Sequence, residues 1–375
     1  MQESGLWNGR CCARPALMSC QVESGSFGHG GSRKDIAAER RSRQNVQVTI
    51  VTETLAEIVL DGKIRLLGAN DAARSSFTAQ AGDSLIALGP GLDVLGRWPV
   101  DPQHRGHHAT CPDRGLALIS GRDEVRLVDH TGRVRWRYPH PPWEGAFESG
   151  CTWFDAAGQP HAVIPDASYD HCLVVCLDLD SGQPRAESAI RARPAGISTV
   201  YHPDGWVGLS EGEGQDAAQA WWVRSVSHSP GEMSIEVLDG GWKSWIFIDV
   251  DPSGSKVITT PHMGGPILVR SFPSLEIVRS IEPPPGESWI ERAFFAGEMI
   301  VGGFGAQEDR FVAISERGRI IDLDQPEARY LVPADHGTWM AVTQTVIRRC
   351  QMTGREEEIP TQSPDEEIPG QTTLW

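Results

Sequence analysis

The chain has 375 residues, a formal net charge of −16 and a pI near 5.2. An acidic surface repels phosphate groups, so this charge argues against nucleic acids and anionic membranes as partners and favours cationic ones. The sequence lacks both a long unbroken apolar run and the apolar core of a signal peptide, so we expect a cytoplasmic, monomeric protein.

Residues 1–44 are rich in Gly, Ser and Arg without periodicity, which predicts a disordered basic arm. The ordered domain is expected from residue 45, and its first extended stretch is VQVTIV at residues 46–51. The stretch EIVL, the pair Asp61-Gly62 and the stretch KIRLL then have the pattern of a β-hairpin with a two-residue turn.

A tight turn closed by glycine then recurs through the chain, each time between two apolar stretches. Six such turns end at Gly115, Gly158, Gly205, Gly254, Gly297 and Gly337, and a shorter copy ends at Gly82. Repeats of roughly 40 to 50 residues built only of strand and turn signals are typical of β-propeller blades, because one blade cannot bury its own faces. The predicted fold is therefore all-β.

Each repeat continues as strand, polar loop, strand, second turn and strand, which gives four strands per unit. The second turns contain Gly132, Gly182, Gly231, Gly318 and Gly354, with Pro273-Ser274 in their place in the repeat of Gly254. We predict one propeller over residues 45–358 with seven four-stranded blades, eight being the alternative. The N-terminal hairpin is expected to close the ring on the last blade, and the acidic residues 359–375 to form a largely disordered tail.

The turns YHPDGWVGL and VDPSGSKVITT resemble the Ser-Pro-Asp-Gly turns of the WD40 and YVTN-like (quinoprotein-like) propeller superfamily, and the resemblance covers residues 75 to 358. The Gly-His and Trp-Asp dipeptides of true WD40 repeats do not occur at the expected places. What the resemblance implies is a ring with a central channel, used most often to hold protein partners and less often to house an enzyme.

One face of such a ring carries the loops between second and third strands and the loops between blades. Acidic residues and tryptophans fall in these loops, and the predicted ligand-binding set is Trp143, Trp242, Trp245, Glu287, Trp289 and Glu291. Indole rings and carboxylates together suit a basic peptide or another cationic ligand. The alternative is that the acids are solvated and that the tryptophans pack between blades.

The segment HRGHHATC brings ligand types for zinc or copper together: His104, His107, His108 and Cys111. Cys111 is expected on the far side of the blade from the histidines, so a complete metal site is not predicted. Cys172 and Cys176, on one strand, are expected to be core residues rather than a disulfide.

No nucleophile elbow, phosphate loop or zinc-protease motif is found. A metal-assisted hydrolase resembling the lactonase-like propellers, with calcium or zinc at the channel, is the enzyme alternative. That resemblance implies calcium held by Glu, Asn and Asp side chains, yet of three asparagines, Asn8, Asn45 and Asn70, none falls in the main repeats. Glu148 and Glu291 are the candidate carboxylates for it. The preferred prediction is a non-catalytic propeller without a cofactor that binds a protein or cationic ligand.

Overall fold

The computed structural model describes residues 47–359 except 51, 101–106, 144–149, 169–170, 193–195, 214–216, 230–231, 240–244, 262–264, 285–288, 305–309, 326, 336 and 354–356. Gln47–Ile359 form one compact unit. The predicted arm, and the predicted tail beyond Ile359, lie outside the described residues.

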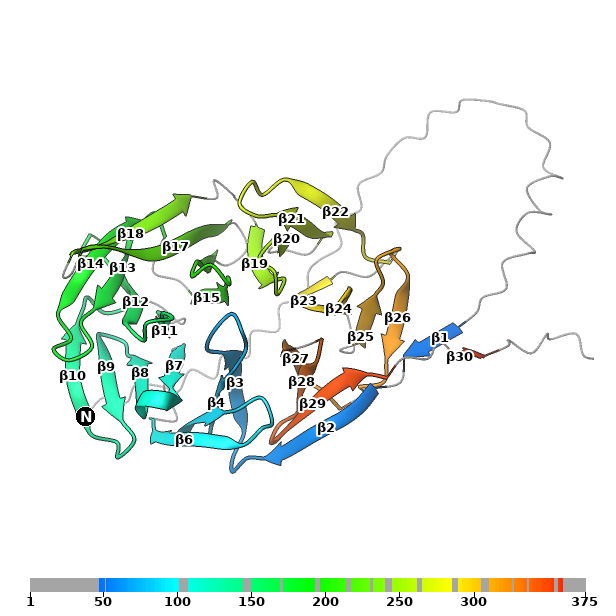
Figure 1. Cartoon of the computed structure of the whole chain (residues 1–375), viewed down its shortest axis with the longest axis horizontal. Coiled ribbons are helices and arrows are strands. Elements are labelled where there is room, and N and C mark those ends of the chain that lie inside the picture. Colours follow the sequence, from blue (N-terminus) through cyan, green and yellow to red (C-terminus); the bar gives the residue numbers. More distant parts are fainter. Residues whose placement is uncertain are drawn as a thin grey trace, which may run out of the picture. The chain divides into compact units, whose positions relative to one another are not determined.

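Seven sheets of at least four strands are arranged as blades around a common centre (Figure 1). Blade 1 contains β3 (Ile64–Ala69), β4 (Phe77–Ala81), β5 (Ser84–Leu88) and β6 (Val94–Pro99). Blade 2 contains β7 (His108–Cys111), β8 (Leu116–Ser120), β9 (Glu124–Asp129) and β10 (Val134–Pro139). Blade 3 contains β11 (Thr152–Phe154), β12 (Pro160–Pro165), β13 (Cys172–Leu177) and β14 (Pro184–Ile190).

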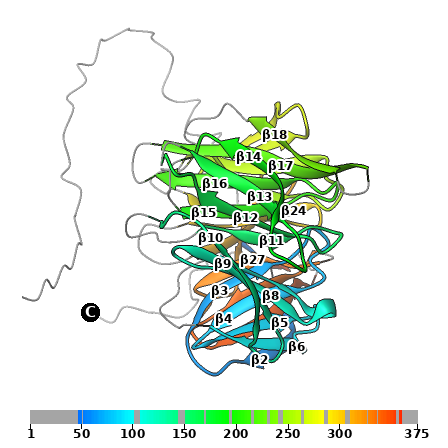
Figure 2. The ribbon, with the colours of Figure 1, turned by 90° about the vertical axis from the view of Figure 1, so that its left-hand side faces the viewer.

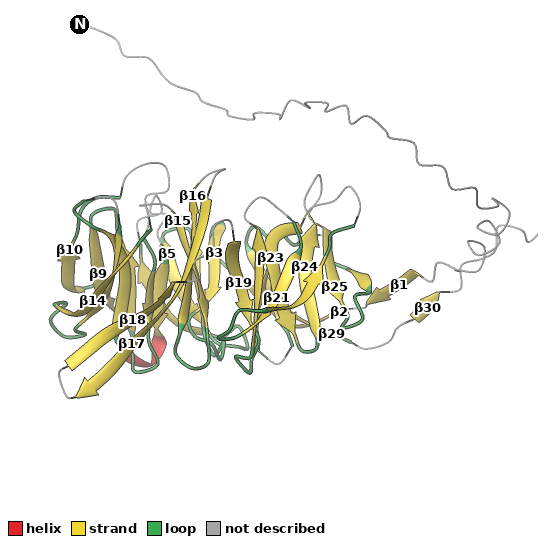
Figure 3. Ribbon diagram, turned by 90° about the horizontal axis from the view of Figure 1, so that it is seen from above, coloured by secondary structure: helices red, strands yellow, loops and turns green. Residues whose placement is uncertain are grey.

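The second half of the ring continues in the same order, and Figures 2 and 3 show the whole ring from two sides. Blade 4 contains β15 (Gly196–Tyr201), β16 (Val207–Glu213), β17 (Ala217–Ser229) and β18 (Glu232–Asp239), and blade 5 contains β19 (Trp245–Val250), β20 (Lys256–Pro261), β21 (Ile267–Ser271) and β22 (Ile277–Ile281). Blade 6 contains β23 (Trp289–Ala296), β24 (Met299–Phe304), β25 (Arg310–Ile314) and β26 (Ile320–Leu323), and blade 7 starts with β27 (Tyr330–Pro333), β28 (Trp339–Val342) and β29 (Val346–Met352). The prediction of an all-β, seven-bladed propeller is confirmed, and the eight-bladed alternative is wrong.

The fourth strand of blade 7 comes from the other end of the chain. It is β2 (Thr52–Val59), which pairs antiparallel with β29, from Thr52 opposite Met352 to Val59 opposite Val346. The ring is therefore closed by terminal strands, as predicted. The preceding strand β1 (Gln47–Ile50) pairs in parallel with β26 and antiparallel with β30 (Glu357–Ile359), so that blade 6 becomes a six-stranded sheet.

The predicted N-terminal hairpin is wrong. The turn at Gly62 has the expected positive φ of 96°, yet β2 and β3 belong to different blades and do not pair. Pairing β2 with β29 gives blade 7 its outer strand and closes the ring, which a local hairpin would not do. The sequence pattern also predicted that the strand after Gly354 is the fourth strand of the last blade. That strand is β30, which pairs with β1 and is not part of blade 7.

The glycine turns have the predicted backbone. All six turn glycines, from Gly115 to Gly337, have φ between 63° and 81°, the left-handed region that glycine enters at little cost. They join the first and second strands of blades 2 to 7, whereas Gly82 joins the second and third strands of blade 1. Connections between first and second and between third and fourth strands lie on one face, called here the turn face. The remaining connections lie on the opposite face, called the loop face.

The core is divided among the junctions between blades. Seven clusters of buried side chains occur in the described part of the chain, and each combines residues of two neighbouring blades. Alternation along each strand explains this, because Leu116 and Leu118 on β8 pack toward blade 3 while Ala117 and Ile119 pack toward blade 1. Within the described residues the one helix is a 3₁₀ turn at Pro112–Arg114, and no helix there is long and apolar enough to cross a membrane.

The closing junction gives a stability test. Ile347 on β29 lies opposite Ile58 of β2 and is fully buried in the cluster between blades 7 and 1. Ile347→Ala should lower the free energy of unfolding by about 2–5 kcal/mol, the usual range for a buried isoleucine. Ile277→Ala is the matched control, since Ile277 is 55% exposed on the outer strand of blade 5 and should change stability by less than about 0.5 kcal/mol. Urea unfolding measures both, and equal effects would contradict the role given to the closing junction.

Candidate functional site

The predicted tryptophans do not form one exposed group in the described structure. Trp143 follows blade 2, but its side chain is completely buried in the cluster between blades 3 and 4. Its position agrees with the alternative that tryptophans pack between blades. Fully or almost fully buried tryptophans also belong to four other junctions, namely Trp98, Trp136, Trp222 and Trp339.

Trp245, the first residue of β19, is half-buried at the loop face. The guanidinium carbon of Arg270 lies over its ring at 5.2 Å from the centroid, so a cation of the chain itself already uses this indole. Trp289 and Glu291 belong to β23 at the same end of the neighbouring blade, but their side chains lie outside the described set. Trp242, Glu287 and Glu148 lie outside the described residues altogether.

The histidine segment is only partly described. His104 lies outside the described residues, while His108 is buried at the start of β7. Burial lowers the pKa of His107, which favours the neutral ring. Cys111 ends the same strand, as the sequence predicted, and no group of potential metal ligands occurs among the described residues.

Carboxylates are nevertheless exposed or half-exposed at the loop face. Asp83 and Asp123 belong to the loops between second and third strands of blades 1 and 2, and Asp166 belongs to the same loop of blade 3. A hydrogen bond from the hydroxyl of Ser168 lowers the pKa of Asp166, so this carboxylate is ionised at neutral pH. In the described part of the chain none of the three makes an ion pair with a basic side chain.

An arginine that the sequence did not indicate connects several blades at the turn face. Arg74 belongs to the loop between β3 and β4, which extends toward the middle of the ring in Figure 1, and has a left-handed φ of 55°. Its guanidinium donates at 2.6 Å to Asp249 of blade 5 and at 3.1 Å to the carbonyl oxygen of Ala334 of blade 7. The second carboxylate oxygen of Asp249 accepts the backbone N–H of Phe295 in blade 6 at 2.9 Å.

This ion pair links four of the seven blades at the turn face. Both side chains are at most 10% exposed, so the charges are removed from water and depend on each other. Burial raises the pKa of Asp249, and the neighbouring guanidinium opposes that rise. The middle of the ring is therefore braced on the turn face.

Asn70 anchors the same loop to blade 2. Its amide nitrogen donates to the hydroxyls of Ser76 and Thr110, both at 3.0 Å, and its oxygen accepts from Thr78 at 2.6 Å. Although Asn70 precedes the predicted repeats, it belongs to blade 1, where it makes structural contacts with three side chains.

The described cysteines have the character of core residues. Cys172 and Cys176 are buried free thiols on β13, as predicted. Burial raises the pKa of each to about 12, and burial also raises the pKa of Cys151 and of Cys350. A thiol with a raised pKa is a poor nucleophile at neutral pH.

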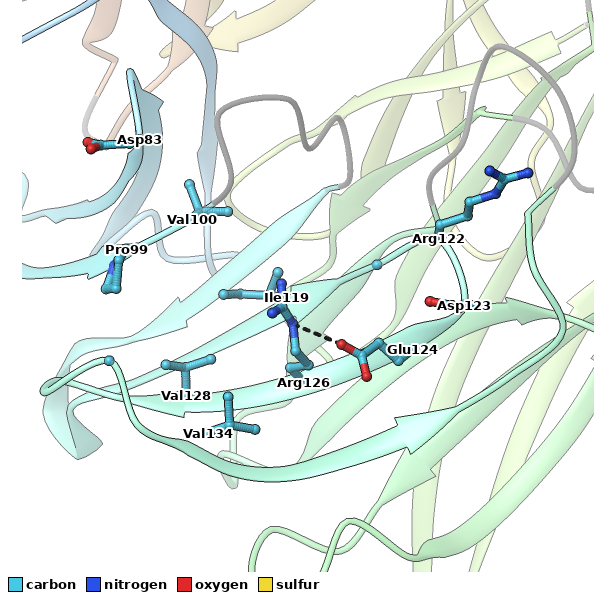
Figure 4. A pocket seen from close by; sticks show the side chains of 12 residues that line it. Asp83, Pro99, Val100, Ile119, Arg122, Asp123, Glu124, Arg126, Val128 and Val134 are labelled. Carbon is cyan, nitrogen blue, oxygen red and sulfur yellow. Dashed lines mark ion pairs between the residues drawn. The ribbon is translucent and has the colours of Figure 1, made fainter.

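A groove of about 490 Å³ lies between blades 1 and 2 (Figure 4). Asp83, Pro99 and Val100 line it from blade 1, and blade 2 contributes residues of β8, β9 and β10 together with Asp123 and Glu124. It includes two of the loop-face acids described above, Asp83 and Asp123. Sequence reasoning did not indicate the groove itself, because it depends on which strand faces meet at this junction.

Comparison with solved structures identifies the architecture. The chain is similar to the β-propeller domain of Cps50 (Swd1) from Myceliophteria thermophila, with 14% identity and a TM-score of 0.51, over 80% of this chain and 100% of that one. The architecture is a β-propeller. The fold that the superfamily resemblance implied is thus confirmed.

Two further solved structures match at lower scores. BamB from Moraxella catarrhalis has 12% identity and a TM-score of 0.43, over 81% of this chain and 99% of that one. BBS1N, in complex with ARL6DN, has 11% identity and a TM-score of 0.48, over 82% and 99% of the two chains. No family model and no curated protein matches the sequence.

The ion pair in the middle of this propeller can be tested through its pH dependence. Arg74→Met leaves the Asp249 carboxylate buried without its cation. This change should lower the free energy of unfolding by about 3–5 kcal/mol at neutral pH. Without the guanidinium the pKa of Asp249 rises further, so the native variant binds a proton more readily than the unfolded chain. The difference in the free energy of unfolding between the wild type and Arg74→Met should therefore become smaller as the pH falls.

Urea unfolding at neutral and acidic pH measures this effect. The double variant Arg74→Met/Asp249→Asn removes both charges and should recover much of the loss, because an amide still accepts from Phe295. If Arg74→Met lowers the free energy of unfolding by less than about 1 kcal/mol, and equally at both pH values, the ion pair does not stabilise the ring.

Proposed function

We propose that the chain is a non-catalytic binding protein whose loop face holds a basic segment of a protein partner. The observation that carries the proposal is the set of loop-face carboxylates Asp83, Asp123 and Asp166, which make no ion pair with a basic side chain among the described residues. A cationic partner gains more binding free energy from a carboxylate that is not already paired with another cation.

Three further features support the proposal. The formal net charge of −16 raises the local concentration of cationic partners around the whole molecule. Arg74 and Asp249 are paired with each other in the middle of the turn face, so their charges are not available to a partner there. The described free thiols belong to packed strands and have raised pKa values, so none is prepared as a nucleophile.

The proposal assigns no role to Trp143, whose side chain is buried, and retains Trp242, Glu287, Trp289 and Glu291 as expected contributors. It also retains a cytoplasmic location and a monomeric state as expectations. Light scattering after size-exclusion chromatography measures the oligomeric state.

Charge reversal on the two faces tests the proposal. A random peptide library is selected on the immobilised protein, and the selected peptides are expected to be rich in Lys and Arg. Asp83→Lys/Asp123→Lys should weaken their binding about tenfold at low salt, and less at high salt, because exposed charges are screened.

The matched control is Asp180→Lys/Asp204→Lys. These two residues are 88% and 75% exposed in turns of the opposite face, and the change in net charge is the same. Binding measured by calorimetry should be little affected in this control. Equal losses in the two variants, or selected peptides without basic residues, would contradict a loop-face site.

A further inference from the structure

The groove between blades 1 and 2 has a chemistry that the proposed function does not use. In blade 2, Ile119 lies opposite Arg126 and Val128 lies opposite Val134 in the strand register. Directly opposite residues point to the same side of a sheet, so these four side chains share the surface turned toward blade 1. This surface of blade 2 therefore combines apolar side chains with the guanidinium group of Arg126 (Figure 4).

The guanidinium group of Arg126 is incompletely neutralised. One carboxylate, Glu124, serves two arginines: its Oε1 atom lies 2.5 Å from Nη1 of Arg137 but 3.4 Å from Nε of Arg126. Within the described part of the chain, this long ion pair is the one polar contact of the Arg126 side chain. Its Nε atom is buried and makes no hydrogen bond.

Two guanidinium groups share one carboxylate here, so Arg126 can offer its guanidinium to a further anionic group. The groove is also lined by Asp83, Asp123 and Arg122. A carboxylate is the group that a guanidinium fork binds best, through two parallel hydrogen bonds. Val134 is half-buried and offers contact to an apolar body, while Val100, Ile119 and Val128 also line the groove but are at most 6% exposed. A groove of about 490 Å³ is of the size that small ligands occupy.

We infer that this groove binds a small monocarboxylate with an apolar body, its carboxylate on Arg126 and its body against the valines and Ile119. The exposed acids Asp83 and Asp123 stand at the rim, together with Arg122. A second negative charge on the ligand would approach these acids. The site therefore selects monocarboxylates over dicarboxylates. This inference goes beyond the loop-face function, because it concerns an anion held by Arg126, although Asp83 and Asp123 take part in both sites.

Calorimetry with octanoate and phenylbutyrate tests the ligand class on the full-length protein. Both should bind, whereas octanamide and phenylbutyramide should bind at least about tenfold more weakly, since they cannot make charge-assisted hydrogen bonds. The dicarboxylate suberate should also bind more weakly than octanoate. If the acids do not bind, or bind no better than the amides, the inference is overturned.

Variants test the position of the site. Arg126→Gln should weaken octanoate binding by roughly tenfold to a hundredfold. Arg135→Gln is the matched control, because Arg135 points to the other side of the sheet, where its guanidinium lies 3.8 Å from Asp180 of blade 3. Unchanged affinity in Arg126→Gln, or an equal loss in both variants, would place the carboxylate elsewhere.

Two more variants make the test independent of any folding defect in Arg126→Gln. Glu124→Gln removes the competing carboxylate and should tighten octanoate binding about two- to fivefold, the scale of a partly exposed ion pair. Val134→Trp fills the groove from a half-buried position and should abolish binding of octanoate and of its amide alike. A Glu124→Gln variant that binds octanoate more weakly than wild type would contradict the inference.

Discussion

The structure depends on burying both faces of every blade, which a ring can do only when it is closed. Each of the seven clusters of buried side chains in the described chain belongs to two blades, so removing one junction exposes apolar surface on both sides of it. The pairing of β2 with β29 is therefore the contact on which the rest depends. It joins residues about 290 positions apart, and Arg348 adds an ion pair to Glu57 at 2.6 Å across the same seam.

The sequence predicts the parts of this fold that are local. A turn with positive φ favours glycine whatever surrounds it, so the six turns from Gly115 to Gly337 could be located and their spacing indicated blades 2 to 7. The seventh blade was counted from Gly82, a turn that joins the second and third strands of blade 1. Strand partners are not local. The stretch around Gly62 has a correct turn signal but two strands that pair elsewhere, because closing the ring outweighs a hairpin between neighbours.

The side chains of the site were harder to predict than the turns. Trp143 lies in a loop by sequence and in the core by structure, and nothing in the segment HPPWEG distinguishes an indole that reaches a neighbouring junction from one that remains at the surface. Arg74 gives no signal either, since its partner Asp249 is 175 positions away and three blades distant. Both residues are fixed by long-range packing, which composition and spacing do not encode. By contrast Cys172 and Cys176 were predicted correctly, because alternation within one strand decides their burial.

The net charge of the chain and the charges near one binding site have different effects. The overall value of −16 governs the long-range field and so the partners that approach, and this was visible in the composition. Binding is decided within a few ångströms, where the cross-strand neighbours Arg126 and Arg137 share one carboxylate. Surface charges more than a Debye length away, about 8 Å at physiological ionic strength, are largely screened at that point. An acidic propeller can therefore attract cations with its loop face and still hold a small anion in one groove between blades.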